Sequence, residues 1–145
     1  MAVAQVEREL AVITQLHQLL LDEYQALRAR CLADLRSVTS AKKKCLAELQ
    51  ALVERRIAVG GDFQSAVATT DPSEHPRLSQ LWTELVNAGI QVRRQNAING
   101  SVIAQSQSHV QQLLAILHGE PAQDCVYDQV ASLSHSKTSR VFATA

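Results

Sequence analysis

Apolar residues recur at intervals of three and four along the first 59 residues, which contain neither glycine nor proline. This is the spacing of a helical seam rather than the alternation of a β-strand. His17 is the one polar residue in the first part of the seam, and Lys42 and Arg56 are polar residues in the second part. The apolar positions are Val3, Val6, Leu10, Ile13, Leu20, Tyr24, Leu27 and Cys31, and then Leu35, Val38, Cys45, Leu49, Leu52 and Val59.

The periodicity permits either one helix of nearly 60 residues or a hairpin that breaks within residues 27–33. A single helix of that size would be about 90 Å long. It could not bury its seam without a partner, because an isolated helix owes most of its stability to packing. A hairpin buries the same seam within one chain. We therefore expect two antiparallel helices, over about 2–29 and 33–59.

Gly60 and Gly61 end the second helix, as glycines do after a helix C-terminus. Asp62 is placed to cap a short turn that carries Phe63 and Val67. Residues 71–76 contain two prolines and read as a connection. Pro76 is a suitable first residue for a third helix, which we expect over about 76–118, with Gly119 and Pro121 ending it. Its expected seam is Leu78, Trp82, Leu85, Gly89, Val92, Asn96, Asn99, Ile103, Ser106, Val110, Leu113 and Leu117.

The middle of this third seam is polar, because Gly89, Asn96, Asn99 and Ser106 cluster there. Asparagine at a seam position lowers stability but fixes register through hydrogen bonds. The same helix carries further apolar residues away from the seam, namely Val86, Ile90, Ile98 and Val102. Either the helix contacts two different partners, or it packs in a groove between two helices and needs a broad apolar stripe.

These elements predict an all-α fold, in which a helical hairpin and a third long helix form an elongated bundle or coiled coil. Residues 1–119 form one domain, and residues 120–145 form a flexible, partly disordered tail in which serines crowd together. Four tail residues are spaced to share one face of a short helix: Val126, Tyr127, Val130 and Leu133.

Charge and cysteine usage narrow the function classes. The 145 residues include 14 Lys and Arg and 14 Asp and Glu, so the formal charge is zero. Nucleic-acid binding requires uncompensated cations and is not favoured, and short runs such as Lys42-Lys43-Lys44 read as solvated helix faces. The chain has three cysteines, an odd number that cannot all pair as disulfides, and their spacing does not fit a metal site. Cys31 and Cys45 lie at seam positions as free thiols, which suggests a reducing compartment. No signal peptide and no stretch of about 18 apolar residues is present, so we expect a cytoplasmic protein without membrane insertion.

The sequence offers no constellation for catalysis, for a metal or for a cofactor. The five histidines lack the spacing of a helical zinc site, and neither a phosphate-binding loop nor a nucleophile elbow occurs. We therefore expect a protein that is not an enzyme. His17 permits the alternative of a histidine phosphotransfer bundle, but its leucine neighbours favour an ordinary half-buried histidine.

Four segments resemble the FlgN family of flagellar type III export chaperones. They are Leu19 to Leu27, read as LLLDEYQAL; Lys42, Leu46, Leu49 and Arg56; Leu81-Trp82 followed by Gln95-Asn96, Asn99-Gly100, Leu114 and Leu117; and Tyr127. The Asn-x-x-Asn-Gly step downstream of Leu-Trp, with a tyrosine behind it, is the most specific part.

The resemblance implies a cytoplasmic chaperone of the hook-associated proteins that form the hook–filament junction. It would bind their C-terminal helical segments, prevent premature assembly, and deliver them to the export gate membrane protein and the export ATPase complex. Client binding is assigned mainly to the C-terminal half of the chain.

We expect recognition of a client helix in a groove. The candidate apolar contacts are Ile90, Ile98, Val102, Ile103, Val110, Leu113, Leu114 and Leu117. Asn96 and Asn99 would supply hydrogen bonds and register, and Gly100 would permit close approach. Val126, Tyr127, Val130 and Leu133 would fold over the client or at the export gate. The rival from another class is a homo-oligomeric coiled-coil scaffold, which one unbroken helix through 27–35 would favour.

Overall fold

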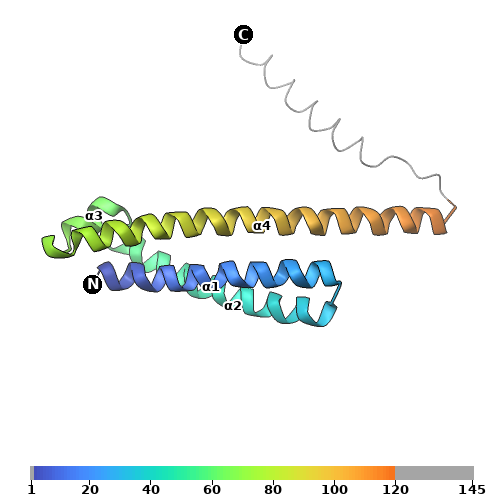
Figure 1. The fold of residues 1–145 in the computed structure, drawn as a ribbon, viewed down its shortest axis with the longest axis horizontal. Coiled ribbons are helices and arrows are strands. Elements are labelled where there is room, and N and C mark those ends of the chain that lie inside the picture. The colour runs from blue at the N-terminus through green and yellow to red at the C-terminus, as the bar shows by residue number, and fades with distance from the viewer. Residues whose placement is uncertain (1, 120–145) are drawn as a thin grey trace, which may run out of the picture. The chain divides into compact units, whose positions relative to one another are not determined.

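The computed structural model describes residues 2–119, and the described residues are helices and their connections, without strands. The helices are α1 (Ala2–Ala29), α2 (Leu32–Ala58), α3 (Phe63–Ala68), the 3-10 turn η1 (Pro72–Glu74) and α4 (His75–Leu117) (Figure 1). The expected all-α fold is confirmed. By its internal contacts the chain divides within α4 into two compact units, Met1–Val102 and Ile103–Ala145.

The hairpin turn consists of two residues, neither of which is glycine or proline. Arg30 has a positive φ of 53°, and Cys31 is extended, with φ −90° and ψ 101°. The Cys31 N–H reaches back to the Ala26 carbonyl at 3.1 Å, which closes the end of α1. The break expected within 27–33 is therefore confirmed, and the feature that the unbroken-helix scaffold required is absent here.

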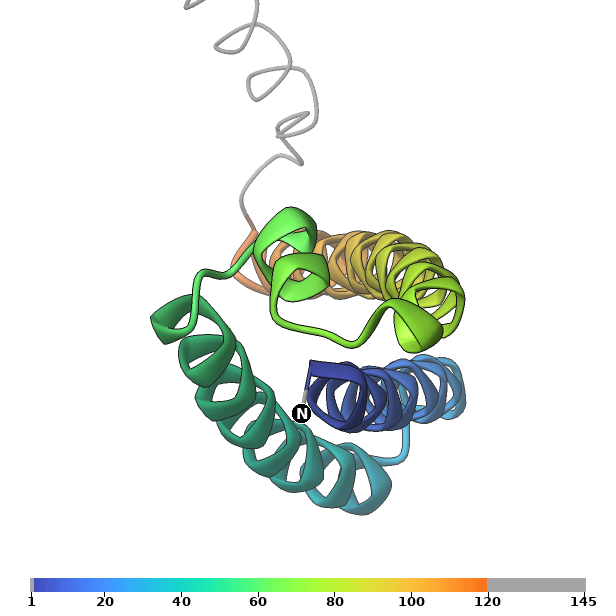
Figure 2. The same ribbon diagram turned by 90° about the vertical axis from the view of Figure 1, so that its left-hand side faces the viewer.

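Helix α1 is the centre of the first unit, because it packs against α2 on one side and against α4 on another (Figure 2). One buried cluster joins α1 to α2 and consists of Val12, Leu16, Leu20, Cys45 and Leu52. A second joins the start of α1 to α4 and consists of Val3, Val6 and Leu78, with Phe63 and Trp82 against it. Since α1 has two neighbours, it buries a broader face than one seam provides.

That broader face corrects the seam expected for α1. Glu9, Val12, Leu16, Glu23 and Ala26 are buried although they lie off the predicted line. Predicted seam residues such as Leu10, Ile13, His17 and Tyr24 are only half-buried. A seam read from sequence assumes one partner, whereas two helices cover α1.

The connection between α2 and α4 follows the expected turn chemistry. Gly60 and Gly61 have φ of 123° and 72°, and the Asp62 carboxylate accepts the Ser65 N–H at 2.9 Å at the start of α3. The hydrogen bonds from Ser65 hold the pKa of Asp62 below its ordinary value. Helix α4 begins at His75, one residue before the expected Pro76, because η1 leads directly into it.

The contact line of α4 in the first unit includes most of the expected seam, since Leu78, Trp82, Leu85, Gly89, Val92 and Asn99 are all buried or half-buried. The line is broader than expected, because Leu81, Ala88, Gln95 and Val102 beside it are half-buried as well. Gln95 therefore takes the place expected for Asn96, which is exposed. Steps of three and four fit more than one heptad line, and the neighbouring helices decide which line is used.

No helix among residues 2–119 combines the length and the hydropathy that a membrane span requires.

Two glycines should respond in opposite directions to alanine. Gly100 is helical with no atom within 4 Å of an added Cβ, so Gly100→Ala should stabilise the protein by up to about 1 kcal/mol. At Gly60 the added Cβ would lie 2.8 Å from Ser65 Cβ, on a backbone with φ 123°. Gly60→Ala should therefore destabilise it by more than about 1 kcal/mol. Urea unfolding followed by circular dichroism measures both, and equal effects would contradict the assignment.

Candidate functional site

Asn99 lies at the centre of a buried polar network that joins α4 to α1. It is 1% exposed, and its Nδ2 donates to the Leu20 carbonyl and to Glu23 Oε2, both at 2.8 Å. Its Oδ1 accepts from Gln95 Nε2 at 3.0 Å. Every polar atom of the Asn99 amide group therefore has a partner within its own chain.

Glu23 extends the network to α2. Its other oxygen, Oε1, accepts from Lys42 Nζ at 2.8 Å, and the carboxylate side chain is almost fully buried. A buried carboxylate is tolerated only when charges and donors compensate it. Lys42 and Asn99 supply that compensation from two different helices. The three long helices of the unit thus meet at one carboxylate.

A second network lies toward the other end of the hairpin. Arg56 Nε donates to both oxygens of buried Glu9 at 3.0 Å, and its guanidinium lies 5.3 Å from the Trp82 ring centroid on α4. Its other end donates to the Gly61 carbonyl. Arg56 therefore ties α1, the end of α2 and the start of α4 together through one planar group.

The two networks have a common register. Glu9 and Glu23 are 14 residues apart on α1, and Lys42 and Arg56 are 14 residues apart on α2. The two ion pairs, Glu9–Arg56 and Glu23–Lys42, are therefore centred on the same point of the turn, as residues that face each other in antiparallel helices must be. Sequence reasoning found Lys42 and Arg56 as polar interruptions and missed their glutamate partners. Opposite charges at matching distances from the turn were the signal that was available.

The expected binding residues of the first unit separate into two groups. Ile90 is 60% exposed, and Ile98, Asn96 and Gly100 are also exposed. Asn99 was expected to hydrogen-bond a partner protein, and in the structure its amide is hydrogen-bonded to Leu20 and Glu23 of α1. The expected close approach at Gly100 is open space in the described structure, since no atom lies within 4 Å of a Cβ there. Val102 is half-buried.

Residues 103–117 of the second unit carry an exposed apolar stripe. Ile103, Val110 and Leu117 are one heptad apart, and Leu113 and Leu114 lie beside them. All five are exposed, and Leu117 most of all at 80%. Ile116 is also exposed, although sequence reasoning left it out. Residues with this spacing form one apolar face of the helix, and such a face is a candidate for contact with another amphipathic helix. Val126, Tyr127, Val130 and Leu133 lie outside the described residues.

The remaining features offer little chemistry. A cavity of about 250 Å³ lies between the start of α1, the end of α2 and α3, with Val6, Ala66 and Trp82 in its wall. Arg56 also lines it but is already paired with Glu9. Residues 2–119 bring together no group of three or more His, Cys, Asp or Glu side chains that suits a metal. His17 is half-buried rather than presented to solvent.

A helical hairpin packed against one long helix defines the class of the fold, an all-helical protein. The family model of the FlgN protein matches residues 2–135. The chain belongs to the FlgN family, and a general role as a flagellar export chaperone follows from that membership. No curated protein and no solved structure matches the chain.

The two asparagines of α4 should differ in their contribution to stability. Asn99→Leu should lower the free energy of unfolding by about 1–3 kcal/mol, because it leaves the Leu20 carbonyl and one Glu23 oxygen without their donor. Asn96→Leu, at an exposed position, should change it by less than about 0.5 kcal/mol. Equilibrium urea unfolding compares the two, and similar values would argue against the network.

Cys45 should be chemically inert in the folded protein. Burial raises the pKa of its thiol, Glu48 raises it further, and Sγ lies 3.4 Å from the Val12 carbonyl. The thiol should stay protonated at neutral pH, where only thiolates react quickly. In a Cys31→Ser, Cys125→Ser background, labelling by a disulfide reagent should be slow until urea unfolds the chain. Fast labelling without urea would contradict this.

Proposed function

We propose that this chain binds the C-terminal helical segments of flagellar hook-associated junction proteins through the exposed apolar face of α4. It keeps these clients from premature assembly in the cytoplasm and delivers them to the membrane protein of the export gate and to the export ATPase complex. The observation that carries the proposal is the stripe Ile103, Val110, Leu113, Leu114 and Leu117. It is apolar, helical in period and exposed in a member of a chaperone family.

The chemistry of the stripe suits an amphipathic helix as its partner. Its apolar residues recur at three, four and seven, which is how a second helix with the same period packs. Unassembled junction subunits would carry such segments, and these would otherwise associate with one another. Burying a leucine or valine contributes roughly 1.5–3 kcal/mol. A few such contacts suffice for an affinity of about 1 μM, near −8 kcal/mol, which suits delivery and release.

The proposal also includes candidate client contacts on the first unit, considered separately from the stripe. Ile90, Asn96, Ile98 and Gly100 are exposed on α4 and are not used by the two buried networks. Asn96 offers an amide for a hydrogen bond, and Gly100 leaves space for a client backbone or side chain. Val102 belongs to the edge of this surface. Asn99 is left out, because its role is to hold α4 against α1.

The tail completes the proposal as an expectation from sequence. Val126, Tyr127, Val130 and Leu133 are spaced for one helical face, and they would fold over the client or at the export gate. Removal of residues 120–145 should then separate client binding from docking at the export gate, because the stripe remains while the tail contacts are lost.

Two acidic substitutions on the stripe should abolish client binding. Val110→Glu with Leu113→Glu should weaken binding of a junction protein's C-terminal segment by about a hundredfold or more, since apolar anchors contribute about 2 kcal/mol each at such interfaces. The matched control is Gln105→Glu with Gln112→Glu, which adds the same charge on the side of the helix away from the stripe. Isothermal titration calorimetry with the full chain measures both.

Thermal unfolding checks the fold separately. Neither double variant should shift the midpoint temperature at which the first unit unfolds. Equal binding by both variants, or no binding of the parent chain to any junction protein from its own genome, would overturn the proposal. A loss in the control alone would also overturn it, because the polar side of the helix would then be the contact.

A further inference from the structure

Positive charge is concentrated around the hairpin turn, although the chain as a whole is neutral. Residues 24–44 contain six of the 14 Lys and Arg residues and one of the 14 acidic residues, Asp34. The rest of the chain carries the compensating excess of acid. Asp22 just before this range is exposed at the same end, so five exposed cations face two exposed carboxylates and the balance there is positive. Such asymmetry gives a surface a field that the net charge does not reveal.

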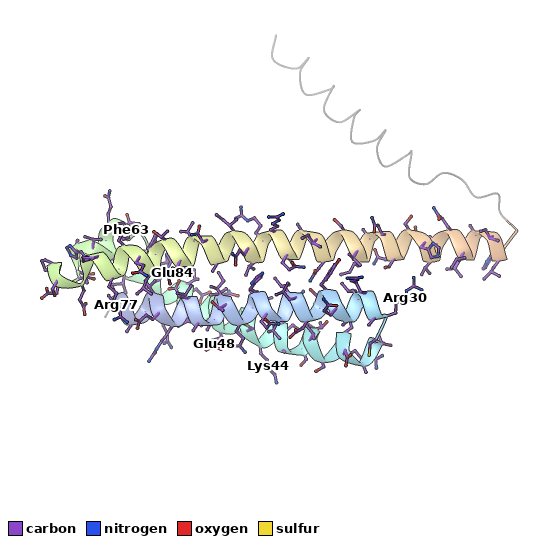
Figure 3. All side chains as sticks on the ribbon, viewed as in Figure 1. Arg30, Lys44, Glu48, Phe63, Arg77 and Glu84 are labelled. Carbon is purple, nitrogen blue, oxygen red and sulfur yellow. The ribbon has the colours of Figure 1, made fainter. Side chains whose placement is uncertain are left out.

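Five of the six cations are exposed: Arg28, Arg30, Arg36, Lys43 and Lys44. We call these five residues the basic tip. The sixth, Lys42, is engaged with buried Glu23. Figure 3 shows Arg30 at the α1–α2 turn and Lys44 on the outer side of α2. Helical rise places the α2 members within about 20 Å of the turn along the helix axis.

An exposed leucine lies among these cations. Leu32 is the first residue of α2 and is 60% exposed, two residues after Arg30. Spacings of four and seven put Leu32, Arg36 and Lys43 on one face of α2, and Leu46 on the same side is also exposed. Cations mixed with a protruding leucine on one helix face are typical of surfaces that contact the headgroup region of a bilayer.

We propose that the basic tip docks on an anionic phospholipid surface, with Leu32 at the depth of the headgroups. Each Lys or Arg close to such a surface raises the partition coefficient about fivefold. Five exposed cations are in the range of clusters that bind acidic lipids. The helices themselves stay outside the bilayer, which agrees with the lack of a spanning helix among residues 2–119.

The local shape favours a lipid surface over an acidic peptide. A peptide needs a groove, and the hollow between α1 and α2 at this end is lined by two carboxylates, Asp22 and Asp34, and by uncharged residues, without a cation. That hollow would repel an acidic peptide. Arg28 and Arg30 instead lie at the two-residue turn, and Arg36, Lys43 and Lys44 are exposed on the convex outer surface of α2. A plane of mobile anionic headgroups adapts to a convex surface without a preformed groove.

The proposal shares no residue with the proposed client surface, so each is tested independently. The probe is vesicles of phosphatidylcholine with and without phosphatidylglycerol, sedimented with the full chain. We expect binding to the anionic vesicles, which weakens as salt is raised because exposed charges are screened. Binding that is equal on both vesicles, or absent from both, would overturn the proposal.

Matched triple variants locate the contact. Arg36→Gln, Lys43→Gln, Lys44→Gln together should lower the partition coefficient about a hundredfold. Arg8→Gln, Arg93→Gln, Arg94→Gln together remove the same charge from exposed positions elsewhere in the first unit and should leave most of the binding. Thermal unfolding confirms that both variants fold. Equal losses would show that net charge alone decides, and would overturn a site at the tip.

A second pair tests the leucine. Leu32→Ser should weaken vesicle binding severalfold at unchanged charge, because an apolar contact with the headgroup region is lost. Ile57→Ser alters a residue of the same exposure, 62%, near the far end of α2 and should have no effect. A chain that binds soluble poly-glutamate but not anionic vesicles would assign the tip to an acidic protein instead, and would overturn the lipid proposal.

Discussion

The carboxylate of Glu23 is the constraint on which the arrangement of the first unit depends. A buried carboxylate is costly unless opposite charge and donors surround it. Lys42 on α2 and Asn99 on α4 provide these at 2.8 Å each. Because the three groups come from three helices, the carboxylate is satisfied only when all three are in register. Glu9 imposes a similar condition through Arg56, whose guanidinium also lies over Trp82 of α4.

These buried networks give α4 two different faces, one that packs against α1 and one that is exposed. The residues that hold α4 against α1, such as Leu78 and Asn99, are buried. Ile90 and Ile98 on the same helix are exposed. A chaperone must keep an apolar surface available without losing its own fold. Here the fold of the first unit rests on two ionic networks and two compact clusters, so the exposed apolar residues are not required for it.

The sequence predicted the elements well and the contacts between them less well. Gly60, Gly61, Asp62, Pro72 and Pro76 are local signals, and each marks a boundary that the structure confirms to within a residue or two. The hairpin break at Arg30 and Cys31 has no such signal. The break was inferred because a long helix needs a second helix against which to bury its apolar seam. The position of α1 decides which residues of α4 are covered. The local sequence pattern therefore could not show that Gln95 is half-buried and Asn96 exposed. The burial of Glu9 and Glu23 likewise depends on the pairing of helices, and acidic residues are ordinarily expected at the surface.

The polar networks also explain how α4 avoids the wrong alignment. Its apolar residues recur at heptad spacing, and a purely apolar seam tolerates a slip by seven residues with little penalty. A slip that brought Val92 opposite Glu23 would leave one carboxylate oxygen buried without a donor, at a penalty of about 1–3 kcal/mol. The Leu20 carbonyl would lose its partner as well. The polar step in the middle of α4 thus lowers helix propensity at Gly100 but specifies one register. A slip by seven residues keeps the same face of α4 against α1, so the network fixes the position of α4 along α1, while Ile90 and Ile98 stay exposed on its other face.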